Sequence, residues 1–166
     1  MAVSSEEIIE KLNTTFAGSI ESAEMLYDML TVTVAKDKIF DVLKFLRDES
    51  SLNFHFLTTC CGIHYPDAER KFAMMYQLHN MIDNTRIRLK SFTNEEEPEF
   101  PSLVTLWDSA NWMERETYDF FGFKFKGHPD LRRILNVDDM VGFPMRKEFP
   151  LEDQARYDKD DKMFGR

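Results

Sequence analysis

The acidic residues and the histidine between Glu114 and His128 are the side chains whose types and spacing could do chemistry. Glu116 and Asp119 stand three positions apart, so a helix would place both carboxylates on one face, as a general acid/base pair requires. Arg115 lies among these acids, and such alternation favours a charge-paired helix surface instead. His128 stands between Gly and Pro, where a hydrogen-bonded turn residue is more common than a metal ligand. A stand-alone acid/base enzyme that uses Glu116, Asp119 and His128 is kept as an alternative hypothesis.

Nucleophilic, metal and phosphate chemistry find little support elsewhere in the sequence. Cys60 and Cys61 are adjacent, which strains a disulfide between them, and two cysteines fall short of the ligands of a zinc or iron–sulfur site. Their spacing singles out none of the four histidines as a catalytic partner. The six glycines are scattered and form no known phosphate-binding loop. We therefore expect the two cysteines to be small apolar residues at a strand end.

The composition limits the kind of protein. A chain of 166 residues suits one domain. Its net charge of −9 argues against nucleic acid as a partner, because phosphate binding needs a basic surface. No apolar run approaches the roughly 18 residues of a membrane span, and the acidic start resembles neither a secretory signal nor a transit peptide. We therefore expect a protein that stays in the compartment where it is made.

Hydrophobic periodicity predicts an α+β protein with a mixed four-stranded sheet and helices packed on one face of it. A capping box formed by Ser4 and Glu7 precedes a short amphipathic helix. The following patterns predict, in order, a strand at 30–35, a helix at 37–47, and strands at 54–58, 72–78 and 86–90. The first strand, helix and second strand form a β-α-β unit, which favours parallel pairing if the two strands are neighbours. The last strand has a basic face, as in an antiparallel hairpin or an edge strand.

The second half of the chain is expected to end in an irregular C-terminal arm. The polar, proline-containing stretch at 94–101 indicates a loop. The patterns that follow predict a short helix capped by Ser102, a helix at 109–121 ended by Gly122, a brief strand at 123–126 and one helical turn from Pro129 through Leu135. We expect one structural domain in three parts: an α/β sheet domain at 1–101, the helix and arm at 102–150 packed on it and on a partner, and a polar tail at 151–166.

The composition of this arm favours docking over chemistry. From Glu114 to Pro150 seven acids balance seven bases, and the aromatic side chains are too many for so broken a segment to bury. Arg132, Arg133, Arg146 and Lys147 could clamp an anion. Arginines among aromatics are more typical of protein–protein contacts. We therefore expect the arm to be a protein-binding surface.

Three segments of the arm carry a specific resemblance. ERETYDFFGF at 114–123, FKGHPDLRRIL at 125–135 and GFPMRKEFP at 142–150 resemble the signature of the 30-kDa subunit family of respiratory complex I, known in bacteria as the C subunit of NADH:quinone oxidoreductase. The resemblance implies a non-catalytic structural subunit of the peripheral arm, with FMN and Fe–S clusters held by other subunits and no cofactor in this chain. It implies the large quinone-site subunit (the 49-kDa type, or D subunit) and neighbouring peripheral-arm subunits as partners, no nucleic acid, and contact with the membrane only through the complex. The implied location is peripheral, on the cytoplasmic side of a bacterial inner membrane.

The resemblance also names the positions expected to serve docking. They are Glu114, Arg115, Glu116, Tyr118, Asp119, Phe121, Gly122, Gly127, His128, Pro129, Leu131, Arg132, Arg133, Gly142, Pro144, Arg146 and Lys147. One position departs from the family, because His64 stands before Tyr65 where many members have an acidic residue. A carboxylate role at that position is therefore in doubt. The first alternative is the equivalent subunit of a related membrane-bound hydrogenase or formate hydrogenlyase, and the second is the acid/base enzyme above.

Overall fold

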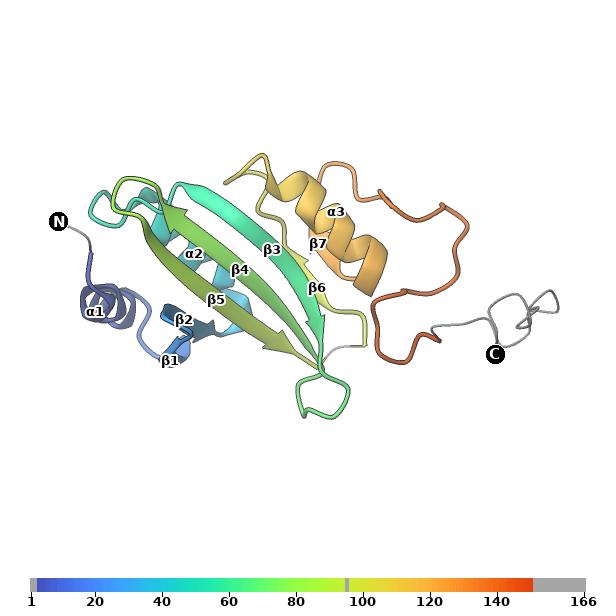
Figure 1. The fold of residues 1–166 in the computed structure, drawn as a ribbon, viewed down its shortest axis with the longest axis horizontal. Helices are drawn as coiled ribbons and strands as arrows, with labels where there is room; N and C mark the ends of the chain where they lie inside the picture. Colours follow the sequence, from blue (N-terminus) through green and yellow to red (C-terminus); the bar gives the residue numbers. More distant parts are fainter. Residues whose placement is uncertain (1–2, 95, 151–166) are drawn as a thin grey trace, which may run out of the picture.

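A five-stranded mixed sheet forms the frame of the computed structural model, which describes residues 3–94 and 96–150 (Figure 1). Its strands are β1 (Ile20–Leu26), β2 (Met29–Val34), β3 (Phe56–His64), β4 (Phe72–Asn80) and β5 (Thr85–Thr93), in the spatial order β1-β2-β5-β4-β3. The pair β2–β5 is parallel, and the other neighbouring strands are antiparallel. The α+β class and the mixed sheet are confirmed.

The number of strands and one pairing differ from the sequence expectation. The expected four strands are one too few, because β1 was missed: five of its seven residues are exposed, so its sequence lacks the alternation of a half-buried strand. The strands of the expected β-α-β unit are not neighbours, since β5 and β4 lie between β2 and β3. The parallel partner of β2 is β5, which is a central strand and not an edge strand. Its expected hairpin with β4 is present.

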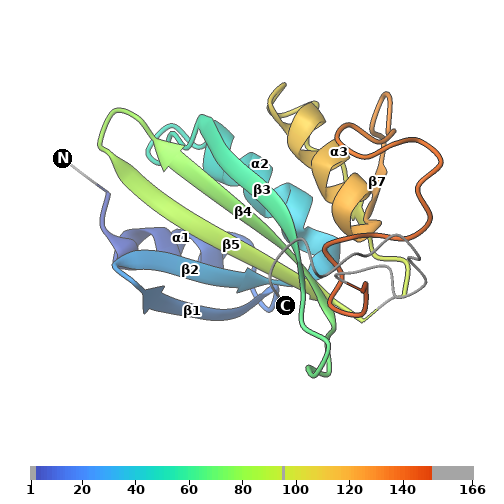
Figure 2. The same cartoon turned by 45° about the vertical axis from the view of Figure 1, so that its right-hand side comes forward.

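Helices cover one face of this sheet. α1 (Ser5–Thr15) begins after Ser4, whose Oγ accepts a hydrogen bond from the N–H of Glu7 at 3.2 Å. The short η1 (Lys36–Lys38) leads into α2 (Ile39–Asp48), which buries an apolar stripe at helical spacing. In Figures 1 and 2 α2 lies behind the strands. The core between helices and sheet is built from fully buried side chains such as Val32, Leu43, Tyr76, Leu78 and Leu89.

The helix α3 (Ala110–Phe121) lies alongside β3 and approaches it at Gly62. A Cβ at Gly62 would lie 2.9 Å from Thr117 and 3.1 Å from Phe123, so only glycine lets the helix come this close. β3 extends from Phe56 to His64, so Cys60 and Cys61 lie in the middle of this strand and not at its end, where the sequence placed them. As predicted, α3 ends at Gly122, whose φ is +77°.

A second, two-stranded sheet joins the two halves of the chain. β6 (Glu99–Pro101) pairs in parallel with β7 (Lys124–Lys126). β7 is the brief strand that was predicted, whereas β6 lies in the stretch that was expected to be a loop. The short helix expected after Ser102 is a single turn, in which the N–H groups of Leu106 and Trp107 both donate to the carbonyl of Leu103.

The arm, residues 127–150, contains no helix or strand, and in Figure 1 it loops out beside α3 and returns to the end of this helix. The helical turn predicted from Pro129 through Leu135 is absent. The N–H groups of Ile134 and Leu135 donate to the carboxylate of Asp119 and not to carbonyls one turn back. The predicted polar tail at 151–166 lies outside the described residues. Within residues 3–94 and 96–150, no helix is long and apolar enough to cross a membrane.

Candidate docking site

The carboxylate of Asp119 is the point at which the arm is attached to α3. Its side chain is fully buried. Oδ2 accepts hydrogen bonds from the backbone N–H groups of Ile134, Leu135 and Asn136 at 2.8 to 3.1 Å. Oδ1 accepts from the side chains of Arg133 and Asn136 at 2.7 and 3.0 Å. Three successive N–H groups converging on one oxygen form an anion-binding nest, here filled by a residue of the same chain.

These hydrogen bonds decide the charge state of Asp119. Burial by itself raises the pKa of a carboxyl group, but the hydrogen bonds from Asn136, Arg133 and Leu135 outweigh it and hold the pKa of Asp119 well below its ordinary value. The carboxylate is therefore ionised throughout the neutral range. A general base needs a pKa near the working pH, so this group is suited to holding structure and not to accepting protons.

Arg133 extends the attachment to the far part of the arm. Its Nη1 donates to the backbone carbonyl of Asp119 at 3.0 Å, in addition to the carboxylate. Its Nη2 donates to the carbonyls of Met140 and Gly142 at 2.9 and 3.1 Å. The guanidinium carbon also lies 5.6 Å from the ring centroid of Phe143. One cation thus joins the helix to two separate positions of the arm.

The first part of the arm is held by Arg115 and His128. Arg115 donates from Nε and Nη2 to the carbonyls of residues 132–133 at 3.3 and 3.2 Å. The Nδ1 of His128 accepts from the N–H of Asp130 at 3.0 Å, so its proton is on Nε2, which lies 3.2 Å from the carbonyl of Asn111. Both side chains are therefore used to fasten the arm along α3.

A stack of rings around Arg146 closes the arm against the sheet. The guanidinium carbon of Arg146 lies 4.8 Å from the ring centroids of both Phe72 and Phe143. Its Nε donates to the carbonyl of Phe121 at 2.7 Å. The ring of Phe143 lies so close to Gly122 that a Cβ there would overlap it. Gly122 therefore has two roles: it ends the helix, and its lack of a side chain leaves room for the ring of Phe143.

His64 holds the last described part of the arm. Its Nδ1 accepts from the N–H of Lys147 at 3.0 Å, and a carboxylate oxygen of Glu148 lies 3.2 Å from the same nitrogen. The two contacts exclude each other, because the first needs Nδ1 without a proton and the second needs Nδ1 with one. We favour the contact with Lys147, since the side chain of Glu148 is 61% exposed. The ring of His64 also stacks on Phe72, with centroids 4.7 Å apart.

Glu114 is a second buried carboxyl group of α3, and it faces the turn before the helix. Its Oε1 accepts from the N–H of Leu103 at 2.6 Å, and its Oε2 lies 2.7 Å from Oγ of Ser102. Burial raises the pKa of Glu114 from 4.5 to about 7, although these hydrogen bonds act in the opposite direction. Glu114 therefore fastens α3 to the preceding turn.

The structure does not bring the proposed acid/base residues into one site. Glu116 is exposed, whereas Asp119 is buried beneath the arm. His128 is bound to the first turn of α3, and its Nδ1 is occupied. Burial raises the pKa of Cys61, and raises that of Cys60 well above its ordinary value, which disfavours the thiolate form of a nucleophile. Within the described residues, no three His, Cys, Asp or Glu side chains are grouped so as to hold a metal ion.

Comparison with known proteins identifies the signature. The family model described as the respiratory-chain NADH dehydrogenase, 30 Kd subunit, matches residues 32–155. The chain belongs to this family. The C subunit of NADH-quinone oxidoreductase from Methylobacterium sp. (strain 4-46) is 40% identical over 158 residues, which cover 94% of this chain and 73% of that relative. The C subunit from Roseiflexus sp. (strain RS-1) is 40% identical over 151 residues, covering 91% and 87%.

Solved structures agree with the 30-kDa subunit family. A trypsin-resistant fragment (1–134) of Nqo5 matches with a TM-score of 0.65 and 29% identity, covering 76% of this chain and 98% of the fragment. A chain from the membrane-bound sulfane sulfur reductase, an archaeal respiratory membrane complex, matches with a TM-score of 0.74 and 25% identity, covering 88% and 85%. The fold is therefore shared with respiratory complexes of more than one kind.

The remaining family-signature residues divide into inward and outward groups. Phe121 and Leu131 are partly buried and pack against the core. Arg132 is 69% exposed at its side chain and pairs with Asp130 at 2.9 Å. Lys147 is exposed as well. The four basic residues thus form no common anion clamp, because Arg133 and Arg146 point to carbonyls and rings while the other two face outward.

Five exposed apolar side chains lie on α3 and on the arm. They are Trp112, Leu135, Val137, Val141 and Met145, each more than half exposed. Exposed apolar groups mark a protein interface when they form one contiguous patch. That the arm binds a protein partner stays a prediction, and the sequence alone did not indicate which of its side chains face outward.

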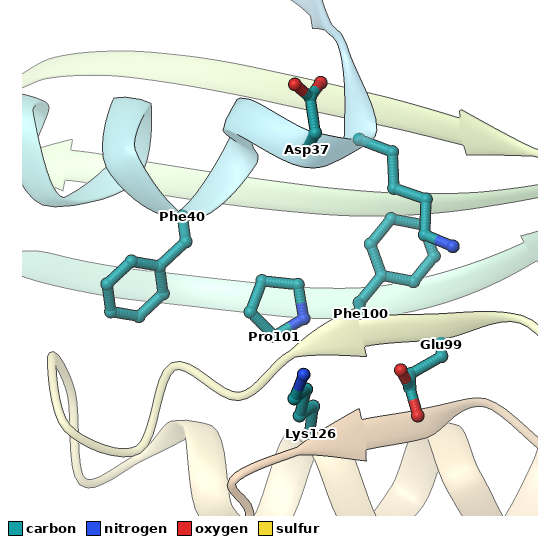
Figure 3. Close-up of a pocket in the computed structure, with 7 residues that line it drawn as sticks. Asp37, Phe40, Glu99, Phe100, Pro101 and Lys126 are labelled. Atoms are coloured by element: carbon teal, nitrogen blue, oxygen red, sulfur yellow. The ribbon is translucent and has the colours of Figure 1, made fainter.

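A groove of about 710 Å³ lies on the other side of the β6–β7 pair, between it and the start of α2 (Figure 3). Phe40, Phe100 and Pro101 supply apolar walls, and Lys126 and Glu99 lie along its β6–β7 side. Nζ of Lys36 lies 5.6 Å from the ring centroid of Phe100. Acidic and basic side chains both line the groove, so it does not favour a ligand of one charge. We interpret it as a gap where two structural elements meet.

Several residues of the docking site were missed by sequence reasoning. Asn136 supplies two of the donors to Asp119, and Ser102 is the hydroxyl partner of Glu114. Phe72 and His64 meet the arm from the sheet. The only available signal was the departure at His64, which marked the position without revealing its partner, 83 residues away in the chain.

Proposed function

We propose that this chain is a non-catalytic structural subunit of the peripheral arm of a proton-translocating NADH:quinone oxidoreductase. In that assembly electrons pass from NADH through FMN and Fe–S clusters, held by other subunits, to quinone. The arm of this chain would dock the large quinone-site subunit of the 49-kDa type. We place the protein on the cytoplasmic side of a bacterial inner membrane, where it would contact the membrane only through the complex.

One observation carries this proposal: buried polar contacts fasten the arm to the body, while several apolar side chains of the arm are exposed beside charged ones. The charged groups of Asp119, Arg133 and Arg146 form hydrogen bonds within the chain. Val137 and Val141, in contrast, are 67% and 90% exposed. An irregular segment of 24 residues without regular structure would not be held by so many buried polar contacts unless its shape mattered. A fixed shape that exposes apolar side chains among charged ones is what a protein partner recognises.

A second candidate is the equivalent subunit of a related membrane-bound hydrogenase-type complex. The likeness to a chain of the archaeal sulfane sulfur reductase complex favours it, because the fold extends over most of both chains. The identity of 25% to that chain is well below the 40% to the bacterial NADH-quinone oxidoreductase relatives, and we therefore prefer the first candidate. The genes encoding neighbouring subunits distinguish the two.

The docking role is tested by retention of the large quinone-site subunit during purification. The double variant Val137→Asp and Val141→Asp places two charges on the outer side of the arm, and we expect retention to fall about tenfold or more. Ile82→Asp is the matched control, because Ile82 is 80% exposed but lies in the turn between β4 and β5. Equal retention by both variants would show that the arm does not dock this partner.

The proposal that this chain holds no cofactor can be tested separately. A visible spectrum and a metal analysis of the purified chain should show neither flavin nor iron in stoichiometric amount. Tightly bound flavin or one equivalent of iron would overturn the structural role. Intrinsic turnover that is lost in Glu116→Gln would instead support the acid/base enzyme.

A further inference from the structure

The helices leave one side of the sheet without cover from any described segment. We call this side, made by the residues of β2 to β5 that alternate with the core residues, the open face. In Figure 2 α1 and α2 both lie behind the strands, and no helix crosses in front of them. On β5 the side chains of the open face are Arg86, Arg88, Lys90 and Phe92, since Ile87 and Leu89 point into the core.

The open face has a sign of charge opposite to that of the whole protein. The chain carries 30 acidic and 21 basic residues. The strands β2, β3 and β4 contain neither Asp, Glu, Lys nor Arg, and the charges of β5 are Arg86, Arg88 and Lys90. The four strands therefore present a purely basic row at the centre of an acidic molecule.

The strand register places no acid beside this row. Arg88 lies between Thr31 of β2 and Gln77 of β4. Lys90 lies between Thr33 and Met75 in the same way. These neighbours are uncharged, and cross-strand neighbours are the ones that could neutralise a cation most directly.

The nearest acids of the sheet are distant or already paired. Glu24 of β1 is opposite Thr31, so it is two strands, about 10 Å, away from Arg88. Glu21 pairs with Arg70 at 2.8 Å, and Arg70 in turn lies 4.6 Å from the ring centroid of Phe92. One end of the open face thus carries a paired cation, and among residues 3–94 and 96–150 no acid forms an ion pair with the central row.

An unsatisfied hydrogen-bond donor on Arg88 is a second indication that a partner is missing. Its Nε is shielded from solvent and, within the described residues, donates to no acceptor. A shielded N–H of a charged group without an acceptor is unfavourable, and native proteins rarely leave one. A carboxylate from outside the chain would supply the missing acceptor in a charge-assisted hydrogen bond.

We propose that the open face binds an acidic segment of a neighbouring protein subunit, at an interface separate from the arm. Carboxylates of the segment would pair with Arg86, Arg88 and Lys90, while apolar side chains beside them would pack on Phe92 and Met75. The proposal rests on membership of a multi-subunit assembly but not on the docking role of the arm. Nucleic acid is disfavoured, since three cations on a protein of net charge −9 give a poor phosphate-binding surface.

The test is site-specific photo-cross-linking in the purified, intact complex. A benzoylphenylalanine at position 77 lies beside Arg88, and the same group at position 44 is the control, because Lys44 is exposed on α2 on the opposite side of the sheet. Position 77 should cross-link to a protein segment that contains Asp or Glu. No cross-link above the control, a cross-link to lipid or nucleic acid, or a segment without carboxylates would each overturn the proposal.

Charge reversal separates this face from the arm. Arg86→Glu with Lys90→Glu should lower the cross-link yield at position 77 about tenfold, and reversing the acids of the captured segment to Lys should restore it. Lys38→Glu with Lys44→Glu, a matched reversal on the helical side, should leave the yield unchanged. Equal yields in the two reversed proteins would contradict the inference. Arg86 and Lys90 are changed in place of Arg88, because replacing the partly buried Arg88 would put folding at greater risk. An unchanged midpoint of unfolding shows that the variant is folded. Retention through the arm should persist in both variants.

Discussion

Nη1 of Arg133 donates to Oδ1 of Asp119 at 2.7 Å, and this contact joins the arm to α3 across 14 residues of chain. The side chain of Asp119 is fully buried, and that of Arg133 is 12% exposed. The neighbouring Arg132 has the same chemistry but lies in solvent. Comparing the two adjacent arginines therefore measures how much burial increases the contribution of an ion pair to stability.

Arg133→Met should destabilise the protein by about 3 kcal/mol, because it leaves the buried carboxylate of Asp119 without its cation. Arg132→Met should cost less than about 1 kcal/mol, as expected for an exposed pair. Chemical denaturation gives both free energies of unfolding. Hydrogen exchange at the N–H groups of 134–136 should accelerate in the first variant alone. Equal effects of the two substitutions would contradict the anchoring role.

Glu114 should give the protein a stability that falls as the pH rises toward neutrality. Its pKa is 4.5 in its ordinary state and about 7 in the folded protein, so between these values the folded state holds a proton that the unfolded chain has lost. The contribution is fully present below about pH 4.5 and is lost as the pH rises through 7, a change on the order of 3 kcal/mol.

Glu114→Gln tests this dependence, because an amide can still accept from Leu103 and donate to Ser102. The free energy of unfolding should then change less between about pH 5 and pH 8. Glu116→Gln on the exposed side is the control and should keep the wild-type slope. An unchanged slope in Glu114→Gln would show that another group titrates.

Asp119 should act in the opposite direction and in a separate range. Its pKa is depressed in the folded state, so its stabilising effect is present above the ordinary carboxyl pKa and is lost as the pH falls toward the lower folded value. Asp119→Asn should be less stable than the wild type at pH 7, by about 3 kcal/mol, since one amide oxygen cannot serve all five donors. Unfolding from about pH 3 to pH 7 should show this difference shrinking in acid. A constant difference would refute the assignment.

Gly122→Ala should cost more than Gly127→Ala. Both glycines have positive φ, +77° and +88°, so alanine strains the backbone at either, by about 1 kcal/mol. Only at 122 would the new Cβ also meet the ring of Phe143, whereas at 127 it would meet nothing within 4 Å. We expect about 2 to 3 kcal/mol at 122. In the Gly122→Ala protein, the further substitution Phe143→Ala should recover part of this larger loss of stability. If it recovers none, the clash with Phe143 is not the cause of the loss.

Local patterns predicted the elements whose apolar face follows one period. The stripe of α2, the alternation of β4 and the end of α3 at Gly122 all belong to this kind. β1 escaped because it has little buried face, and the place of β5 between β2 and β4 depends on contacts across the chain that no local period encodes.

The sequence indicated several residues that fasten the arm to α3, but it did not indicate the contacts that they make. Asp119 was interpreted as part of a charge-paired helix surface, because its donors come from an irregular segment without periodic signal. The same donors explain why the helical turn after Pro129 is absent. The contact between His64 and Lys147 spans most of the chain and left no mark in the local pattern.

The nest around Asp119 also bears on how fast this protein can be assembled into its complex. A segment that orders only on binding must lose about 1 to 2 kcal/mol of backbone entropy per residue at that moment. Here the loss has been met during folding, because the N–H groups of 134–136 are already fixed on a carboxylate of the same chain. This part of the arm therefore has its shape before the protein meets a partner. Its association rate should be set by diffusion and orientation, and not by a search of the arm for its shape.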